Sequence, residues 1–300
     1  MYNQLKRGLS PDAIIVHVDY SESYDNRHQD EIQSEYFGHS QFSIFTAVAY
    51  SRSPLDNELN KDCFAIVSEA SDHSRIAAHT CTQRIIDEVI VLHPNLLNYD
   101  KLDVHIWSDG CSAQFRSRFV FQLTTEFTDK FNVTRYYHER HHGKGPMDGI
   151  GGCIKHVVYR SVLCGREIIT TPYDFVECAN RLVKNIRCLY LPEDDMLKEP
   201  EGVKNAPYCS EMQILQVHML KRLITRAGFH CLRFFKIASD QESFHDQWYS
   251  KNDLEPCGHF DAALPSNDNC ALCAISENGR NWIKCPRCDQ WFHDDCFYNE

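Results

Sequence analysis

The sequence lacks two features that define whole classes of protein: long apolar runs and a surplus of positive charge. No stretch approaches the roughly 18 uninterrupted apolar residues of a membrane-spanning helix, and residues 1–12 lack the apolar segment of a secretory signal. These absences predict a soluble, intracellular protein without a membrane partner. The net charge of -11 excludes a protein whose entire surface binds nucleic acid, because phosphate binding depends on Lys and Arg. Any contact with DNA must therefore be local.

One segment of this acidic chain contains more basic than acidic residues. Residues 135–160 carry five Lys or Arg side chains and four histidines, against only Glu139 and Asp148. The segment is either a basic strip on an acidic body or an ordinary solvated face, and charge alone leaves both interpretations open.

The fifteen cysteines fall into two groups. Scattered single cysteines among apolar residues, such as Cys63 and Cys81, are expected to be buried thiols. In the last thirty or so residues the spacing changes to C-x-x-C, C-x-x-C and H-x-x-C, and each such pair can supply two of the four tetrahedral ligands of a zinc ion. The predicted zinc ligands are Cys270, Cys273, Cys285, Cys288, His293 and Cys296.

The spacing of apolar residues, which make up 43% of the chain, predicts an α/β fold. Short β-branched runs that end in turn residues indicate strands, and apolar residues three and four apart indicate helices. The order is three strands, helix, strand, helix, strand, helix. The expected strands are 13–19, 42–49, 63–69, 101–109 and 133–137, and the expected helices are 76–93, 114–131 and 149–162.

Beyond residue 165 the pattern weakens. It indicates helices over 173–186 and 211–226 and a strand over 231–237, whereas the polar stretch 240–269 is typical of a linker. The expected division is a core over 10–165, a helical continuation of that core over 166–239, the linker over 240–269 and the zinc-binding segment over 270–300.

Three aspartates lie at the end of a strand or the start of a helix, positions where catalytic or metal-binding residues often occur. Asp19 ends the first strand, Asp109 ends the strand after the first helix, and Asp148 opens a helix. Carboxylates brought together in this way bind Mg²⁺ or Mn²⁺ for phosphoryl transfer. The alternative is structural: Asp19 and Asp109 would satisfy turn amides, and Asp148 would stabilise its helix N-terminus.

The order of elements and the placement of these acids resemble the RNase H-like fold, a mixed sheet flanked by helices. The segments DYSESY, SDGCSAQF and HGKGPMDGIGG resemble blocks of a transposase-derived family in animal genomes, within the DDE/D transposases and integrases. The resemblance covers residues 13–160. It implies that Asp19, Asp109 and Asp148 bind Mg²⁺ or Mn²⁺.

The same resemblance places further residues at the site. It implies that His142 and Lys144 lie near the scissile phosphate of DNA. Glu139 is the chief rival of Asp148 for the third acid, and Glu22 could assist at the first block. His142 is also compatible with an ordinary loop histidine.

The stretch WIKCPRCDQWFHDDC resembles the corresponding run of PHD fingers, a likeness that covers residues 270–300. It implies one zinc site of Cys270, Cys273, His293 and Cys296. Cys285 and Cys288 would belong to a second zinc site, which needs a further C-x-x-C pair to be complete. The sequence ends at Glu300 before such a pair, so we expect a fragment of a longer protein. A zinc ribbon that uses the four C-x-x-C cysteines on one ion is the alternative.

PHD fingers bind histone tails, and some hold methyl-lysine in an aromatic cage, so a histone tail is an expected partner and the nucleus the expected location. Trp282 could serve such a cage, or both Trp282 and Trp291 could pack the small core.

Two functions follow. The chain is either a metal-dependent DNA strand-transfer enzyme with a chromatin-binding finger, or a domesticated, catalytically inactive scaffold whose zinc finger binds chromatin or protein. A nuclease acting on other nucleic acids is a third interpretation. Transposases of this kind usually act as oligomers.

Overall fold

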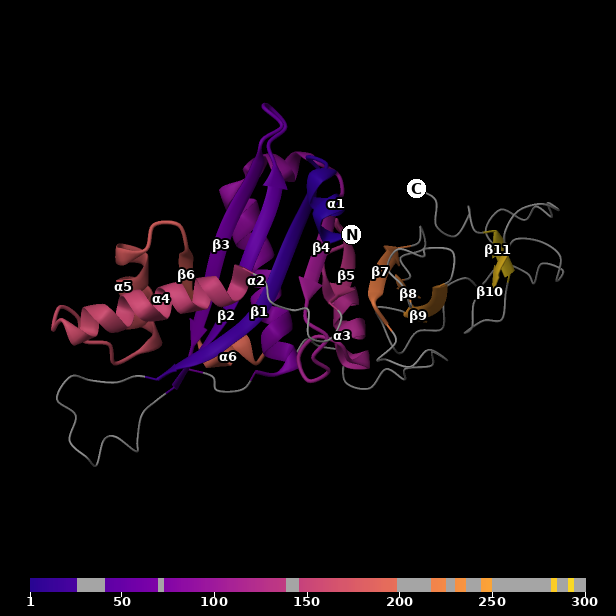
Figure 1. Ribbon diagram of the computed structural model, residues 1–300. Helices are drawn as coiled ribbons and strands as arrows, with labels where there is room; N and C mark the ends of the chain where they lie inside the picture. The colour runs from indigo at the N-terminus through magenta and orange to yellow at the C-terminus, as the bar shows by residue number, and fades with distance from the viewer. Residues whose placement is uncertain are drawn as a thin grey trace.

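The computed structural model describes residues 1–25, 41–69, 73–138, 146–198, 217–224, 230–235, 244–249, 282–284 and 291–293. Half of the ten elements before residue 140 are strands, and these five strands belong to one sheet (Figure 1). The ten elements are α1 (Tyr2–Arg7), β1 (Ala13–Asp25), β2 (Gln41–Arg52), β3 (Leu59–Ser68), α2 (Arg75–Leu92), the 3-10 helix η1 (Pro94–Asn98), β4 (Leu102–Ser108), α3 (Arg118–Leu123), the 3-10 helix η2 (Thr124–Glu126) and β5 (Phe131–Tyr137).

The elements after residue 140 begin with the long helix α4. They are α4 (Pro146–Leu163), α5 (Pro172–Leu182), β6 (Arg187–Tyr190), α6 (Glu193–Met196), β7 (Met219–Ile224), β8 (His230–Phe235), β9 (Phe244–Tyr249), β10 (Trp282–Lys284) and β11 (Trp291–His293).

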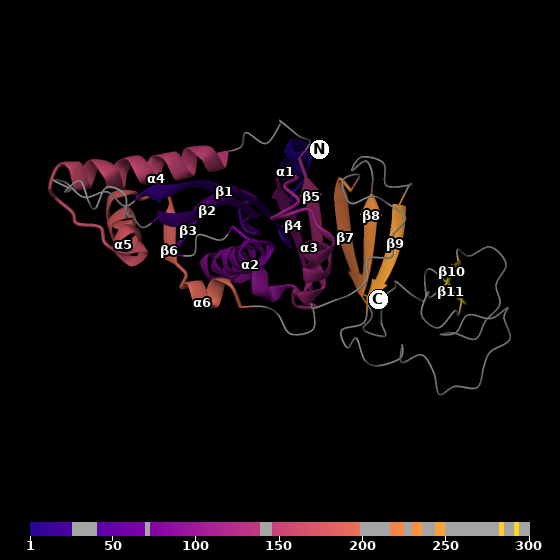
Figure 2. The ribbon, with the colours of Figure 1, turned by 90° about the horizontal axis from the view of Figure 1, so that it is seen from below.

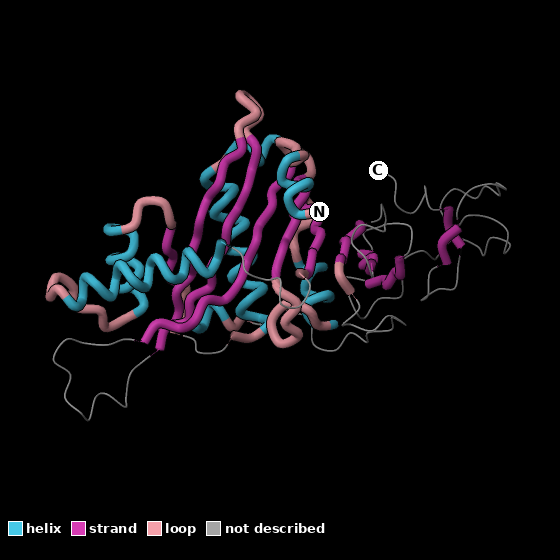
Figure 3. Tube along the Cα trace, in the orientation of Figure 1, coloured by secondary structure: helices cyan, strands magenta, loops and turns pink. Residues whose placement is uncertain are grey.

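Nine of the strands form one mixed sheet in the order β6-β3-β2-β1-β4-β5-β7-β8-β9. β1 is antiparallel to β2, and β2 is antiparallel to β3. On the other side β1 is parallel to β4, which is parallel to β5. The strands β7, β8 and β9 continue the sheet in antiparallel fashion. β10 and β11 form a separate hairpin, and Figure 3 shows both groups of strands in one view.

Helices cover both faces of the sheet (Figure 2). We call the two faces the α2 face and the α4 face. The α2 face is covered by α2, α3 and α6, and the α4 face is covered by α1, α4 and α5, as the membership of the two buried clusters shows. Because successive side chains of a strand point to opposite faces, β1 contributes Ile14 and Val16 to the first cluster and Ile15 to the second.

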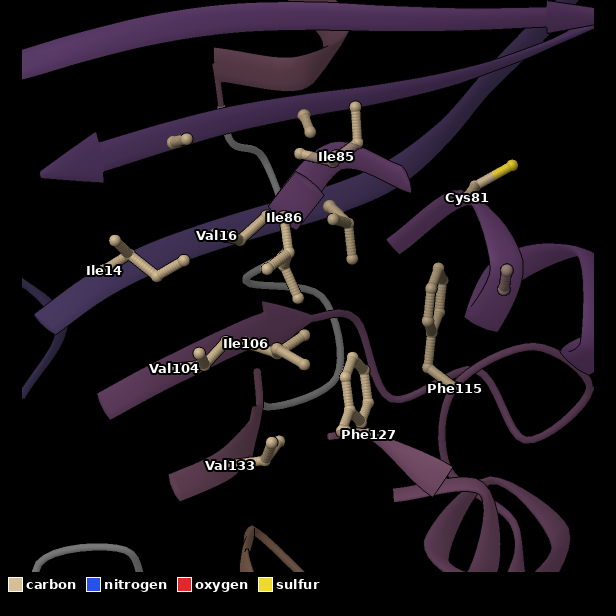
Figure 4. Close-up of a cluster of buried hydrophobic side chains, with 14 of the residues drawn as sticks. Ile14, Val16, Cys81, Ile85, Ile86, Val104, Ile106, Phe115, Phe127 and Val133 are labelled. Carbon is tan, nitrogen blue, oxygen red and sulfur yellow. The ribbon is translucent and has the colours of Figure 1, made fainter. Parts of the chain in front are cut away.

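The core on the α2 face is almost wholly aliphatic and phenylalanine. Ile85 and Ile86 of α2 are fully buried against Val16 and its neighbours on β1 and β4 (Figure 4). Burying one such side chain contributes about 1.5–3 kcal/mol relative to leaving it in water.

The expected α/β architecture and most of its elements are confirmed. The first three strands, the helix near 76–93, the strands near 101–109 and 133–137, and the helix near 149–162 all exist. Further along, α5 confirms most of the helix expected over 173–186, and β8 confirms the strand expected near 231–237. No helix among the described residues is long and apolar enough to cross a membrane.

The first strand was expected to end at Asp19, but it continues beyond this residue. β1 continues to Asp25 and stays paired with β2, with a shift of register between Ser21 and Tyr24. The polar residues that indicated a turn are accommodated by this bulge, and buried Tyr24 holds the extension against Phe42 and Phe175.

The helix expected over 114–131 is much shorter, because α3 covers only Arg118–Leu123. The hydroxyl oxygen of Ser117 accepts a hydrogen bond from the amide of Val120 and so begins the helix there. Residues 109–116 instead form turns, in which the carbonyl of Cys111 accepts the amides of Phe115 and Arg116.

The helix expected over 211–226 is wrong for the described residues 217–224, where β7 pairs with β5 and β8. Buried Arg222 holds this strand in place by donating hydrogen bonds to the carbonyls of Phe127 and Thr128, at 2.6 and 2.7 Å. The helical spacing of apolar residues in this segment carries no information about these partners, which are more than ninety residues away in the sequence.

The expected helical continuation and linker also need correction. Residues 166–239 contain β6, β7 and β8, so this part is not helical throughout. β9 lies inside the stretch 240–269 that was expected to be a linker, and it pairs with β8 along its whole length.

Candidate active site at the ends of β1 and β4

Asp19 lies in β1 just beyond the part of the strand that pairs with β4, which ends at the pair His17 and Trp107. Its main-chain carbonyl accepts a hydrogen bond from the hydroxyl of Thr46 on β2, at 3.1 Å. Burial, and then the negative charges of Asp109 and Asp148, together raise the pKa of the Asp19 carboxyl to about 7. The carboxyl group of Asp19 is therefore a near neighbour of both other acids.

Asp109 follows directly after β4. One of its carboxylate oxygens accepts a hydrogen bond from the amide of Cys111, at 3.0 Å, and so closes a tight turn. The expectation that this acid satisfies a turn amide is confirmed. Because a carboxylate has several acceptor positions, this turn leaves the group able to bind a cation as well.

Asp148 lies in the first turn of α4, where its side chain is exposed. A negative charge at this place is favoured by the helix dipole. The helix N-terminus also brings Asp148 close enough to Asp19 to raise the pKa of the Asp19 carboxyl. The structure thus brings together the three aspartates from β1, the end of β4 and α4.

The three carboxylates are close without forming a finished ligand set. In the part of the chain that the structure describes, no group of three or more His, Cys, Asp or Glu side chains stands close enough to hold a metal ion. Their arrangement is one of mutual electrostatic repulsion around Asp19.

A pair of histidines beside the acids was not anticipated from the sequence. The Nε2 atoms of His17 and His138 are 3.1 Å apart, so one ring donates a hydrogen bond to the other. Burial, and then His138, lower the pKa of His17 to about 3, so His17 is neutral at neutral pH. Burial also lowers the pKa of His138, against the opposite effect of Asp109.

Aromatic rings pack around this histidine pair on the α4 face. Trp107 and Tyr136 are stacked with ring centroids 4.5 Å apart, and Tyr2 of α1 lies against Trp107 and His17. His17 precedes Asp19 by two residues and Trp107 precedes Asp109 by two, so period-two alternation was the signal that could have identified both.

A buried cation lies beside Gly110, the residue that follows Asp109. Arg116 is 3% exposed, and a Cβ atom at Gly110 would lie only 2.8 Å from its Nη2 atom. Glycine at this position therefore gives the guanidinium group its space. Arg116 was not predicted as a site residue, although it lies only seven residues after Asp109.

Neither interpretation of residues 135–160, a basic strip or a solvated face, holds for Arg135. This residue is buried and donates from Nε to the hydroxyl of Thr124, at 2.9 Å. Lys155 donates to the main-chain carbonyl of Glu22, at 3.0 Å, on the α4 face. Glu139, His142 and Lys144 lie outside the described residues, as does Arg140.

Most of the expected zinc ligands also lie outside the described residues: Cys270, Cys273, Cys285, Cys288 and Cys296. His293 is at the end of β11, where it pairs with Trp282 of β10. The two strands of this hairpin thus flank the second predicted ligand pair in the sequence, and β11 ends at the first residue of the third pair.

The fold and site define an α/β protein with a carboxylate cluster at the ends of neighbouring strands. The chain belongs to the family described as Domain of unknown function (DUF8701), whose model matches residues 1–226. That match includes α1, the first seven strands of the main sheet and all three aspartates. No curated protein and no solved structure matches the chain.

Proposed function

We propose that the chain contains an RNase H-like core of the DDE/D transposase type, which cleaves and joins DNA strands with the help of Mg²⁺ or Mn²⁺. Asp19, Asp109 and Asp148 are the proposed metal ligands. The observation that carries this proposal is the raised pKa of Asp19, which Asp109 and Asp148 help to cause although they are 90 and 129 residues away. Asp109 and Asp148 thus lie near enough to Asp19 to disfavour its negative charge, and a bound cation would offset that repulsion.

The topology supports the same assignment. Strands β3-β2-β1-β4-β5 lie side by side, with β1 to β3 antiparallel and β4 and β5 parallel to β1. Helices α2, α3 and α4 follow β3, β4 and β5 in turn. This order resembles the RNase H-like fold, and in it the acids come from the first strand, the fourth strand and the last of these helices.

The chemical type of the three side chains suits a hard divalent cation. Mg²⁺ and Mn²⁺ prefer carboxylate oxygens, and a cation between the acids would relieve the repulsion that, after burial, raises the pKa of Asp19. When bound, such an ion activates water or a 3'-hydroxyl group and stabilises the leaving oxygen.

We further propose that residues 270–300 form a partial PHD-type finger, which binds Zn²⁺ and a histone tail in the nucleus. The support is the ligand spacing together with the β10–β11 hairpin, which sets Trp282 opposite His293. Zinc content of the purified protein tests the first part, and loss of zinc in His293→Ala is the expected result.

The alternative is a catalytically inactive scaffold with a zinc-dependent chromatin-binding finger. The net charge of -11 and the absence of a finished metal-ligand set among the described residues favour it. On this alternative the acids repel one another for no catalytic purpose.

Metal-dependent cleavage of DNA distinguishes the two. Wild-type protein, Asp109→Asn and the control Asp195→Asn, which changes an exposed acid of α6, would be compared with Mn²⁺ and with chelator. Cleavage that requires Mn²⁺ and is lost only in Asp109→Asn is expected. Folded, zinc-containing protein that never cleaves DNA would leave the scaffold alternative.

A further inference from the structure

One glycine of α4 is packed far more tightly than the other two. A Cβ atom added at Gly151 would lie 2.1 Å from Oγ and 2.6 Å from Cβ of Ser21 on β1. A Cβ atom added at Gly149 or Gly152 would meet nothing within 4 Å. Only Gly151 is therefore required by packing, and the obstacle includes Cβ of Ser21, which cannot move without the main chain.

Gly151 lies between two residues that contact or influence the same part of β1. Asp148, Gly151 and Lys155 are three and four residues apart, so they share one side of α4. Lys155 Nζ donates to the main-chain carbonyl of Glu22 at 3.0 Å and lies 3.7 Å from the Glu22 carboxylate. The helix lies across the sheet at this strand (Figure 2).

The strand is bulged where the helix meets it. The pairing of β1 with β2 shifts register between Ser21 and Tyr24, which places Glu22 in the bulge. A bulge leaves main-chain groups of the strand without their usual partners, and Lys155 provides one for the carbonyl of Glu22. The bulge begins two residues after Asp19.

We infer that Gly151 is a positioning residue: its missing side chain lets α4 sit directly on Ser21, and this contact carries Asp148 to Asp19. Lys155, one turn further along α4, stabilises the same contact between helix and strand through its hydrogen bond to the carbonyl of Glu22. The inference rests on the proposed function, because it assigns to this contact the spacing of two proposed metal ligands. A helix displaced by a methyl group would take Asp148 away from the site.

The test adds a methyl group to the helix and removes the hydroxymethyl side chain of Ser21 from the strand. Gly151→Ala adds the obstructing Cβ atom, Ser21→Gly removes the atoms that it meets, and the double variant combines both changes. Gly151→Ala with Ser21→Ala removes only Oγ and leaves Cβ in place. Gly149→Ala and Gly152→Ala are matched controls on the same helix, and Lys155→Met loosens the contact without adding bulk.

Three measurements would be made on each full-length variant: thermal unfolding, Mn²⁺ affinity from the paramagnetic resonance signal of free Mn²⁺, and Mn²⁺-dependent cleavage of DNA. We expect Gly151→Ala to unfold at lower temperature, to bind Mn²⁺ more weakly and to cleave about a hundredfold more slowly, as expected for a misplacement of about 1 Å. Ser21→Gly should restore all three properties, Ser21→Ala should not, and the controls should resemble wild type. Lys155→Met should need more Mn²⁺ for half-maximal cleavage.

Gly151→Ala with wild-type Mn²⁺ affinity and cleavage would overturn the inference. So would a recovery by Ser21→Ala as complete as that by Ser21→Gly, since Cβ of Ser21 would then be no obstacle. If Gly151→Ala does not fold, recovery of folding by Ser21→Gly supports the contact and its failure overturns it. Wild-type protein that neither binds Mn²⁺ nor cleaves DNA refutes the proposed function, and the unfolding temperatures alone then decide the contact.

Discussion

The two faces of the main sheet are packed with different kinds of side chain. On the α2 face, the core around Val16, Ile85 and Phe121 is almost entirely aliphatic and phenylalanine. On the α4 face near the acids, the buried residues include Trp107 and Tyr136, and His138 packs against Trp107. Both faces also bury polar or charged groups, whose burial costs free energy. On the α4 face His17 is such a group, and on the α2 face Arg135 is one, with its guanidinium 3.5 Å from Nδ1 of His79 on α2.

The largest expected effect is a cavity in the α2 face. Ile85→Ala should lower the free energy of unfolding by about 2–5 kcal/mol, because a fully buried aliphatic side chain is removed from a close-packed core. Chemical denaturation measures it. Val91→Ala on the same helix is the control, since Val91 is 67% exposed and should change stability by less than about 0.5 kcal/mol. Equal losses in both variants would contradict this view of the α2 face.

Each face also contains a buried histidine that makes stability depend on pH. Burial, and then Arg135, lower the pKa of His79 to about 3, whereas an unfolded histidine titrates near 6.5. Between these values the unfolded chain binds a proton that the folded chain does not, so stability is present above pH 6.5 and is lost as pH falls. The slope is about 1.4 kcal/mol per pH unit.

His79→Gln should therefore weaken the loss of stability between pH 7 and pH 5, as measured by denaturation at each pH. His17 contributes with the same sign on the α4 face, since its pKa is also lowered to about 3. Asp19 acts in the opposite direction: its raised pKa means that its contribution is lost as pH rises from about 4 towards 7. An unchanged pH profile in His79→Gln would show that this histidine is not held neutral.

Asp19→Asn should separate stability from activity on the α4 face. Removing a carboxylate that burial and two like charges disfavour should raise stability by about 1–2 kcal/mol at pH 8, a value reduced because solvent partly screens the group. DNA cleavage should be lost at the same time. Denaturation and cleavage assays on one sample check both, and lower stability would show that Asp19 has a favourable partner.

The smallest expected difference concerns the helix N-termini on the two faces. The hydroxyl of Thr171 accepts the amide of Asp174, whose carboxylate accepts the amide of Thr171 in return, so α5 begins with a capping box. α2 has only the hydroxyl of Ser74 accepting from Ala77. Thr171→Ala should cost about 1 kcal/mol and Ser74→Ala about 0.5 kcal/mol, measured by denaturation. The reverse order would mean that α2 depends more on its cap than on its packing.

Much of the fold was predictable because it depends on local patterns. The apolar β-branched runs around Ile15 and the helical spacing around Ile85 predicted elements that the structure contains. The gathering of Asp19 and Asp109 followed from topology alone, since both are placed where neighbouring parallel strands end their pairing.

The features that escaped prediction depend on contacts between distant residues. Residues 219–224 form the strand β7 because Arg222 donates hydrogen bonds to carbonyls more than ninety residues away. The strand β9 is stabilised by its pairing with β8. The pairing of His17 with His138 and the seat of Gly151 on Ser21 likewise join residues over a hundred positions apart. No local pattern of apolar residues contains such information.

The sheet continues past the region that the family model matches, which ends at residue 226, two residues after β7. In the whole chain the outer side of β7 is paired with β8 along its entire length. A protein shortened at residue 226 would keep the three aspartates and Gly151 but present that side of β7 as a bare edge. Free strand edges recruit other chains, so such a shortened protein would be prone to self-association, and activity assays are better carried out on the longer chain.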